Sequence, residues 1–106
     1  MAKYLFRVSY TAAGIQGVLK EGGKSRAAAI KKTFASVGGK IEAGYWAFGS
    51  DDWVGIADLP DHAAAIALSA TVAASGAATV NTTVLFTADD VDAAVALTPQ
   101  YRAPGA

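Results

Sequence analysis

The chain has 106 residues, of which 53% are hydrophobic and 17% charged, with nine basic and nine acidic side chains, one histidine and no cysteine. This length suits a single compact domain, and the apolar content excludes a disordered chain. The absence of cysteine excludes a disulfide scaffold and a cysteine-ligated zinc site.

The first part of the chain reads as one strand followed by two helical segments. Apolar and aromatic side chains alternate over residues 4–10, which predicts a strand. A helical stretch follows to about Lys20 and stops at a pair of glycines. Ser25 is the expected N-cap of a second helix, which ends before Gly38.

A β-hairpin and another long helix come next. Residues 40–48 and 52–58 are apolar and aromatic runs on either side of a turn-forming segment, which is a hairpin signal. Pro60 is expected in the first turn of a helix that ends at Gly76. Alanine covers this helix nearly all round, so it can lie very close to whatever packs on it.

The last elements are a strand, a short helix and a tail. Residues 78–86 alternate as a fourth strand does. Thr87 and Asp90 form a variant of the capping box at the start of a helix that runs to about Leu97. Residues 98–106 contain two prolines and predict a flexible tail, so residues 1–97 are expected to form the single domain.

This order of elements predicts an α+β protein with the ferredoxin-like βαββαβ plan: a four-stranded antiparallel sheet, both main helices on one face, and an extra C-terminal helix. The other face of the sheet must carry one side of the first strand, either the set of Leu5, Arg7 and Ser9 or the aromatic set that begins at Tyr4. Neither set is polar enough to face water, so we expect a homo-oligomer whose sheets pack against each other.

The segment from Gly44 to Asp61 resembles the signature region of the GYD-domain family. Ser25-Arg26 and Gly38-Gly39 upstream, and Ser75-Gly76 downstream, are similar to the same family. The resemblance therefore covers nearly the whole domain.

Around the hairpin turn, Gly49 and Asp52 match the glycine and the aspartate that help to name the family, and Asp51 stands where the family has its aromatic residue. The resemblance implies a ferredoxin-like dimeric α+β barrel of bacterial type. It implies no particular reaction.

Few residues of the chain offer chemistry. We expect His62 to be an exposed residue at a helix start, because no second imidazole or cysteine is present to complete a metal or nucleophilic site. Asp51 and Asp52 are typical of a tight turn, and Asp52 is the candidate base if the hairpin closes over a pocket. Arg26, at the edge of an apolar helical stripe, is interpreted as a side chain that extends along the rim.

A hollow space between two sheets would gather a further set of side chains. Arg7 lies in the middle of a strand, where we expect an internal ion pair in preference to an anionic ligand. Tyr45 and Trp46 must take opposite faces of the hairpin, because successive side chains of a strand alternate. The candidate ligand-binding residues are Arg7, Tyr45, Asp52, Trp53, Asn81 and Thr83.

These observations favour a small cytoplasmic homo-oligomer that binds a small molecule or serves a structural role. The alternative is a cofactor-free oxygenase or isomerase that acts on a small aromatic compound, by analogy with other dimeric α+β barrels. We expect no metal, cofactor, nucleic acid or membrane partner, because the chain lacks a glycine-rich phosphate loop, an overall basic bias and a long apolar stretch.

The net charge of zero is a cancellation. Residues 1–41 carry eight basic side chains and one acid, a net +7, whereas residues 42–106 carry one basic side chain and eight acids, a net −7. Such asymmetry bears on association rather than on chemistry. Helix capping accounts for several acids but not for the basic helical region, so complementary contacts between subunits are favoured over nucleic acid.

Overall fold

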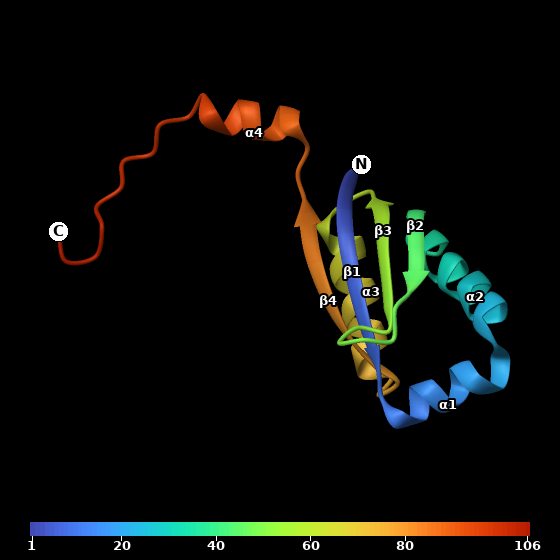
Figure 1. Cartoon of the computed structure of the whole chain (residues 1–106). Helices are drawn as coiled ribbons and strands as arrows, with labels where there is room; N and C mark the ends of the chain where they lie inside the picture. The colour runs from blue at the N-terminus through green and yellow to red at the C-terminus, as the bar shows by residue number, and fades with distance from the viewer.

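The computed structural model describes residues 1–106 as four strands and four helices (Figure 1). In chain order the elements are β1 (Ala2–Tyr10), α1 (Ala12–Glu21), α2 (Gly23–Ala35), β2 (Lys40–Trp46), β3 (Trp53–Leu59), α3 (His62–Ala74), β4 (Ala78–Leu85) and α4 (Ala88–Val95). The strands form one antiparallel sheet in the order β2-β3-β1-β4. The α+β, ferredoxin-like arrangement predicted from the order of elements is therefore confirmed.

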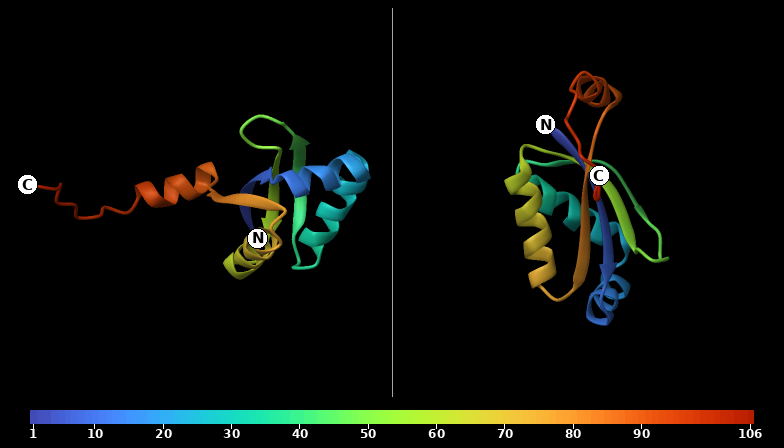
Figure 2. Two further views of the ribbon diagram at one scale, coloured as in Figure 1. Left: turned by 90° about the horizontal axis from the view of Figure 1, so that it is seen from below. Right: turned by 90° about the vertical axis from the view of Figure 1, so that its left-hand side faces the viewer.

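Helices α2 and α3 lie on the same face of the sheet, and α1 runs past its end (Figure 1, Figure 2). On β1, Tyr4 and Phe6 are buried beneath the helices, whereas Arg7 is exposed on the opposite face. Because side chains alternate along a strand, Leu5 and Ser9 share the face of Arg7. The structure thus decides which set of β1 side chains faces away from the helices.

Aromatic side chains from the sheet and from α2 fill the core. Phe6 meets Phe34 edge to face, with ring centroids 4.9 Å apart. Trp53 is 4% exposed, and two glycines make room for its indole. A Cβ at Gly55 would lie 2.2 Å from the ring, and one at Gly44 would lie 2.7 Å from it. Glycine is required at both positions because carbon atoms do not approach so closely.

The start of α2 corrects one prediction. Ser25 is not an N-cap, because α2 begins at Gly23, directly after α1, with Gly22 as the residue between the two helices. Gly22 adopts φ +85°, a region that glycine reaches without the clash that a Cβ would cause. The chain therefore turns in a single residue instead of the longer break that two glycines predicted.

The start of α3 corrects a second prediction. Pro60 precedes the helix rather than lying in its first turn, and Asp61 is the N-cap, whose carboxylate accepts a hydrogen bond from the amide of Ala64 at 2.9 Å. The capping box of Thr87 and Asp90 on α4 is confirmed, with both reciprocal hydrogen bonds present. Side-chain caps thus set the starts of both α3 and α4.

Residues 86–106 form a C-terminal arm that leads away from the domain (Figure 1, Figure 2). It consists of α4 and a segment with no further helix or strand. None of the helices has the length and apolar character needed to cross a bilayer. The cytoplasmic location stays a prediction from the sequence.

Replacement of Gly55 by alanine tests whether this glycine makes room for the indole of Trp53. We expect Gly55→Ala to lower the free energy of unfolding by about 1–3 kcal/mol, because the added methyl group forces the indole out of its place. Urea denaturation followed by tryptophan fluorescence measures this change. The matched control is Gly49→Ala, since a Cβ at Gly49 meets no atom within 4 Å. Equal stability of the two variants contradicts the interpretation.

Candidate functional site

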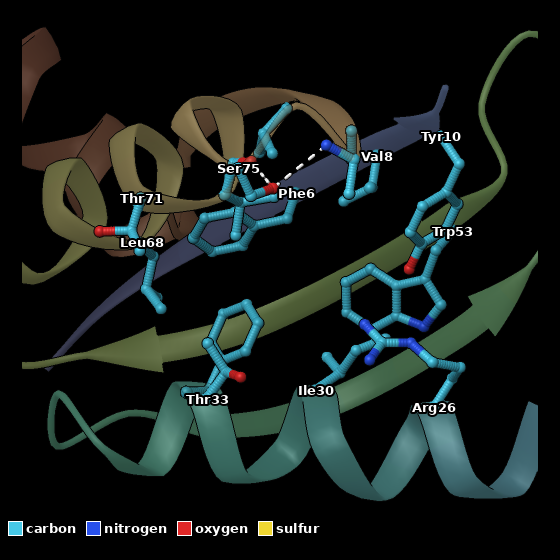
Figure 3. Close-up of a pocket in the computed structure, with 15 residues that line it drawn as sticks. Phe6, Val8, Tyr10, Arg26, Ile30, Thr33, Trp53, Leu68, Thr71 and Ser75 are labelled. Atoms are coloured by element: carbon cyan, nitrogen blue, oxygen red, sulfur yellow. Dashed lines mark hydrogen bonds between the residues drawn. The ribbon is translucent and has the colours of Figure 1, made fainter. Parts of the chain in front are cut away.

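A cavity of about 300 Å³ lies between α2, α3 and the sheet (Figure 3). Its walls are mostly apolar and include Phe6 and Val8 from β1, Ile30 and Phe34 from α2, and Leu68 and Val72 from α3. The small side chains of Ala77 and Ala78, after the end of α3, leave part of this space unfilled. An apolar cavity with a few polar groups is the usual form of a small-molecule site.

One end of the cavity, called its polar end below, holds Arg26, the one charged residue of the lining, whereas the hydroxyl groups of Thr33, Thr71 and Ser75 lie elsewhere on the walls. Figure 3 shows the guanidinium of Arg26, the hydroxyl of Tyr10 and the indole of Trp53 at that end, while Leu68 lies toward the other. The Arg26 side chain is 29% exposed, and its ion-pair partner is Glu21, at a distance of 3.6 Å. An arginine so placed offers several hydrogen-bond donors to a bound anion.

The Tyr10 hydroxyl makes no hydrogen bond within the chain, although the Tyr10 ring and backbone are both held in place. The ring stacks on Trp46, with centroids 6.1 Å apart, and the amide of Tyr10 donates to the carboxylate of Asp52 at 2.7 Å. The hydroxyl is therefore positioned but unpaired at the polar end of the cavity.

Of the six candidate ligand-binding residues, Trp53 lines this cavity. Asp52 lies beside it, but its carboxylate is engaged by the Tyr10 amide, and its own amide donates to the carbonyl of Val8 at 2.8 Å. Asp52 thus ties the hairpin to the end of β1, as turn aspartates often do. A carboxylate held in this way is poorly placed to act as a base.

The remaining four candidates lie on the open face of the sheet. The strand register aligns Tyr45, Val54, Arg7 and Asn81 in one row across the four strands, and places Thr83 opposite Leu5 in the next row. Tyr45 is 73% exposed, and its neighbour Trp46 lies on the helix side, as alternation predicted. Trp53 and Asp52 therefore lie in or beside the cavity on the helix side, whereas the other four candidates lie on the opposite face of the sheet.

The ion pair expected for Arg7 is absent. Arg7 is exposed, and no carboxylate of the chain lies within 4.0 Å of its guanidinium. The reason is the register, because its neighbours across the sheet, Val54 and Asn81, carry no charge. The expectation assumed burial, whereas the open face leaves Arg7 accessible to water.

A charged cluster occupies one end of the open face. Lys3 Nζ donates to Asp58 at 2.9 Å and to Glu42 at 3.1 Å. The hydrogen bond to Asp58, followed by that to Glu42, raises the pKa of Lys3 above its usual value. The charge of Lys3 is therefore balanced within the chain, whereas that of Arg7 is not.

His62 is exposed at the start of α3, as predicted, but it also has a partner that sequence reasoning missed. Its Nδ1 lies 2.6 Å from the hydroxyl of Tyr4, whose side chain is 1% exposed. The imidazole thus satisfies a phenol that the core would otherwise leave without a partner. The two residues are 58 positions apart, so no local pattern could have joined them.

The single histidine and the acidic residues form no group of three that could hold a metal ion. Arg26 lines the cavity, although its sequence position predicted only a side chain at the rim of an apolar helix and did not place it among the candidate ligand-binding residues. Its position at the edge of the apolar stripe of α2 was visible in the sequence. Its contact with a cavity depends on the spacing between α2 and α3, which no helical pattern encodes.

The fold and the cavity define a ferredoxin-like α+β protein with one open sheet face and an apolar pocket beneath two helices. The GYD domain family matches residues 4–95, and the chain belongs to this family. No curated protein and no solved structure matches the chain. The matched range includes both the cavity and the open face.

Removal of the His62 imidazole tests its role in the core. We expect His62→Ala to lower the free energy of unfolding by about 1–3 kcal/mol, because the Tyr4 hydroxyl is left buried and unpaired. Thermal and urea denaturation measure the loss. In the control, Tyr4→Phe on the His62→Ala background removes the unpaired hydroxyl and restores part of the stability. A double variant less stable than His62→Ala contradicts this account.

Proposed function

We propose that the protein binds a small, mainly apolar molecule with an anionic group in the cavity between α2, α3 and the sheet. The observation that carries this proposal is the cavity itself, an apolar space of about 300 Å³ with Arg26 at its polar end. This volume is at the lower end of the range for ligand sites and suits a single-ring compound. The proposed site lies on the opposite face of the sheet from the one expected for a barrel interior.

The physical chemistry of the cavity favours an anion over a neutral ligand. Apolar walls surround part of the half-buried Arg26 side chain, and a charge-assisted hydrogen bond is stronger beside such walls than in open water. Glu21, the present partner, contacts Arg26 at 3.6 Å from an exposed position. A ligand carboxylate can replace this loose ion pair with a shorter one.

A matched pair of ligands tests the proposal. We expect 3-phenylpropanoate to bind more tightly than its neutral amide, and Arg26→Gln to weaken the acid by about tenfold or more, since a hydrogen bond to a charged group contributes about 1.5–3 kcal/mol. The amide should be affected little. Titration calorimetry measures both affinities.

Two further variants serve as controls. Arg7→Gln removes an arginine from the open face and should leave both affinities unchanged. Val72→Phe fills the cavity and should abolish binding of the acid and of the amide. The proposal fails if the acid binds Arg26→Gln as tightly as the unaltered protein, or if Val72→Phe retains binding.

A cofactor-free oxygenase or isomerase acting on a small aromatic compound is the second candidate. One observation favours it: the unpaired Tyr10 hydroxyl stands at the polar end of the cavity, where it can exchange a proton with a bound ring. The cavity lining contains no carboxylate or imidazole, so binding has the stronger support. Oxygen consumption with 4-hydroxyphenylacetate, compared between the unaltered protein and Tyr10→Phe, separates the two functions.

We also propose that the protein is a homo-oligomer in which two open sheet faces pack together as a dimeric α+β barrel. The support is the apolar surface of that face, to which Leu5, Val54, Ile56 and the exposed ring of Tyr45 contribute. Such a surface is covered in most proteins by a partner. A second copy supplies the same apolar surface by symmetry.

The oligomer is tested by a charge on the open face. We expect Ile56→Lys to shift the protein from dimer to monomer at micromolar concentration, because the lysine must be desolvated in the interface. Light scattering coupled to size exclusion measures the mass. Ile66→Lys is the matched control, since Ile66 is exposed on α3 and away from the sheet. A monomeric unaltered protein, or equal masses for both variants, refutes the proposed interface.

A further inference from the structure

The C-terminal arm, residues 86–106, has no partner in the chain that accounts for it. The radius of gyration is 16.9 Å, whereas a compact domain of this length has about 13 Å. Helix α4 has eight residues, and isolated helices of that length are not stable in water. The arm exposes large apolar side chains between 54% and 80%, namely Phe86, Val91, Val95, Leu97 and Tyr101. These features indicate that the arm is stabilised by contact with another surface.

The acidic side chains of the arm indicate what kind of surface it can contact. Asp89, Asp90 and Asp92 make α4 acidic, and none of them is in an ion pair. A complementary surface must therefore be basic, with room for apolar side chains between the charges.

The outer face of α2 meets this description. Lys24, Lys31 and Lys32 are exposed there without ion pairs. Lys31 and Lys32 border a shallow depression whose other residues are alanines: Ala28, Ala29 and Ala35. Small side chains let another helix approach closely, and the lysines flank its path.

The sheet order prevents this contact within one molecule. Strands β2 and β4 are at opposite edges of the sheet, α2 packs beside β2, and the arm leaves from β4 in the other direction (Figure 1). If two sheets face each other about a two-fold axis along the strands, the β4 edge of each copy lies over the β2 edge of the other. Each arm then starts over the β2 edge of the partner and passes around that edge to reach α2 on the partner's other face, and the two symmetric contacts form together.

We propose that the C-terminal arm of one copy docks on the outer face of α2 of a second copy. Val91 and Val95 pack over the alanine depression, Asp92 flanks this pair on the helix and lies beside Lys31 and Lys32, and Asp89 adds its negative charge from the first turn. This pairing accounts for part of the opposite charges of the two parts of the chain; it rests on the proposed sheet-to-sheet dimer and does not depend on what the cavity binds.

Charge reversal tests the proposal in the full-length chain. We expect Lys31→Glu with Lys32→Glu, and separately Asp89→Lys with Asp92→Lys, to raise the dimer dissociation constant on the order of tenfold at low salt. The combination of all four substitutions should restore much of the affinity, since every pair is then reversed together. Sedimentation velocity measures the constants, and Lys20→Glu on α1 is the control.

Because the chain has no cysteine, a disulfide can locate the contact. We mix Val95→Cys with Ala28→Cys under mild oxidation and expect a covalent pair of the two variants, distinguished by mass. Val95→Cys mixed with Ala73→Cys, an exposed site on α3, should form little of it. Docking on α2 is overturned if Val95→Cys couples equally to both sites, or if the four-residue reversal fails to restore affinity. Binding of 3-phenylpropanoate by these variants should stay unchanged, which separates this result from the fate of the cavity.

Discussion

The fit of Trp53 against the sheet is the contact on which the other features depend. Its indole covers Gly55 and reaches Gly44 on the next strand, so each of these two positions must lack a side chain. This arrangement fills the centre of the space under the helices with one large ring. The space that remains beside the ring, toward Arg26 and α3, is the cavity. The same packing that stabilises the core therefore shapes the candidate site.

The strand register places different side chains on the two faces of the sheet. The helix side carries the core, the cavity and the Tyr10 hydroxyl, all supplied by one chain. The open face carries an apolar surface, a balanced cluster around Lys3 and an Arg7 without a charge partner. The two proposals accordingly use different faces, the first for ligand binding and the second for self-association.

Local features were the most predictable. The capping box of Thr87 and Asp90 and the alternation of Tyr45 with Trp46 depend on residues within a few positions of each other, and both are confirmed. The errors at Ser25 and Pro60 are also local. Helix α2 begins directly after the turn at Gly22, and α3 begins after Asp61, whose carboxylate caps it. For Asp52, composition predicted the turn, whereas the contact with Tyr10 needed the fold.

The sequence by itself determined the α+β class, the order of the elements, the family resemblance and the separation of charge along the chain. These follow from periodicity and composition, which are properties of neighbouring residues. Only the tertiary structure decided that Arg7 faces away from the helices, that His62 pairs with Tyr4, and that Arg26 lines a cavity. Such contacts join residues far apart in the chain, and they depend on strand register and on the distance between helices, which no local pattern specifies.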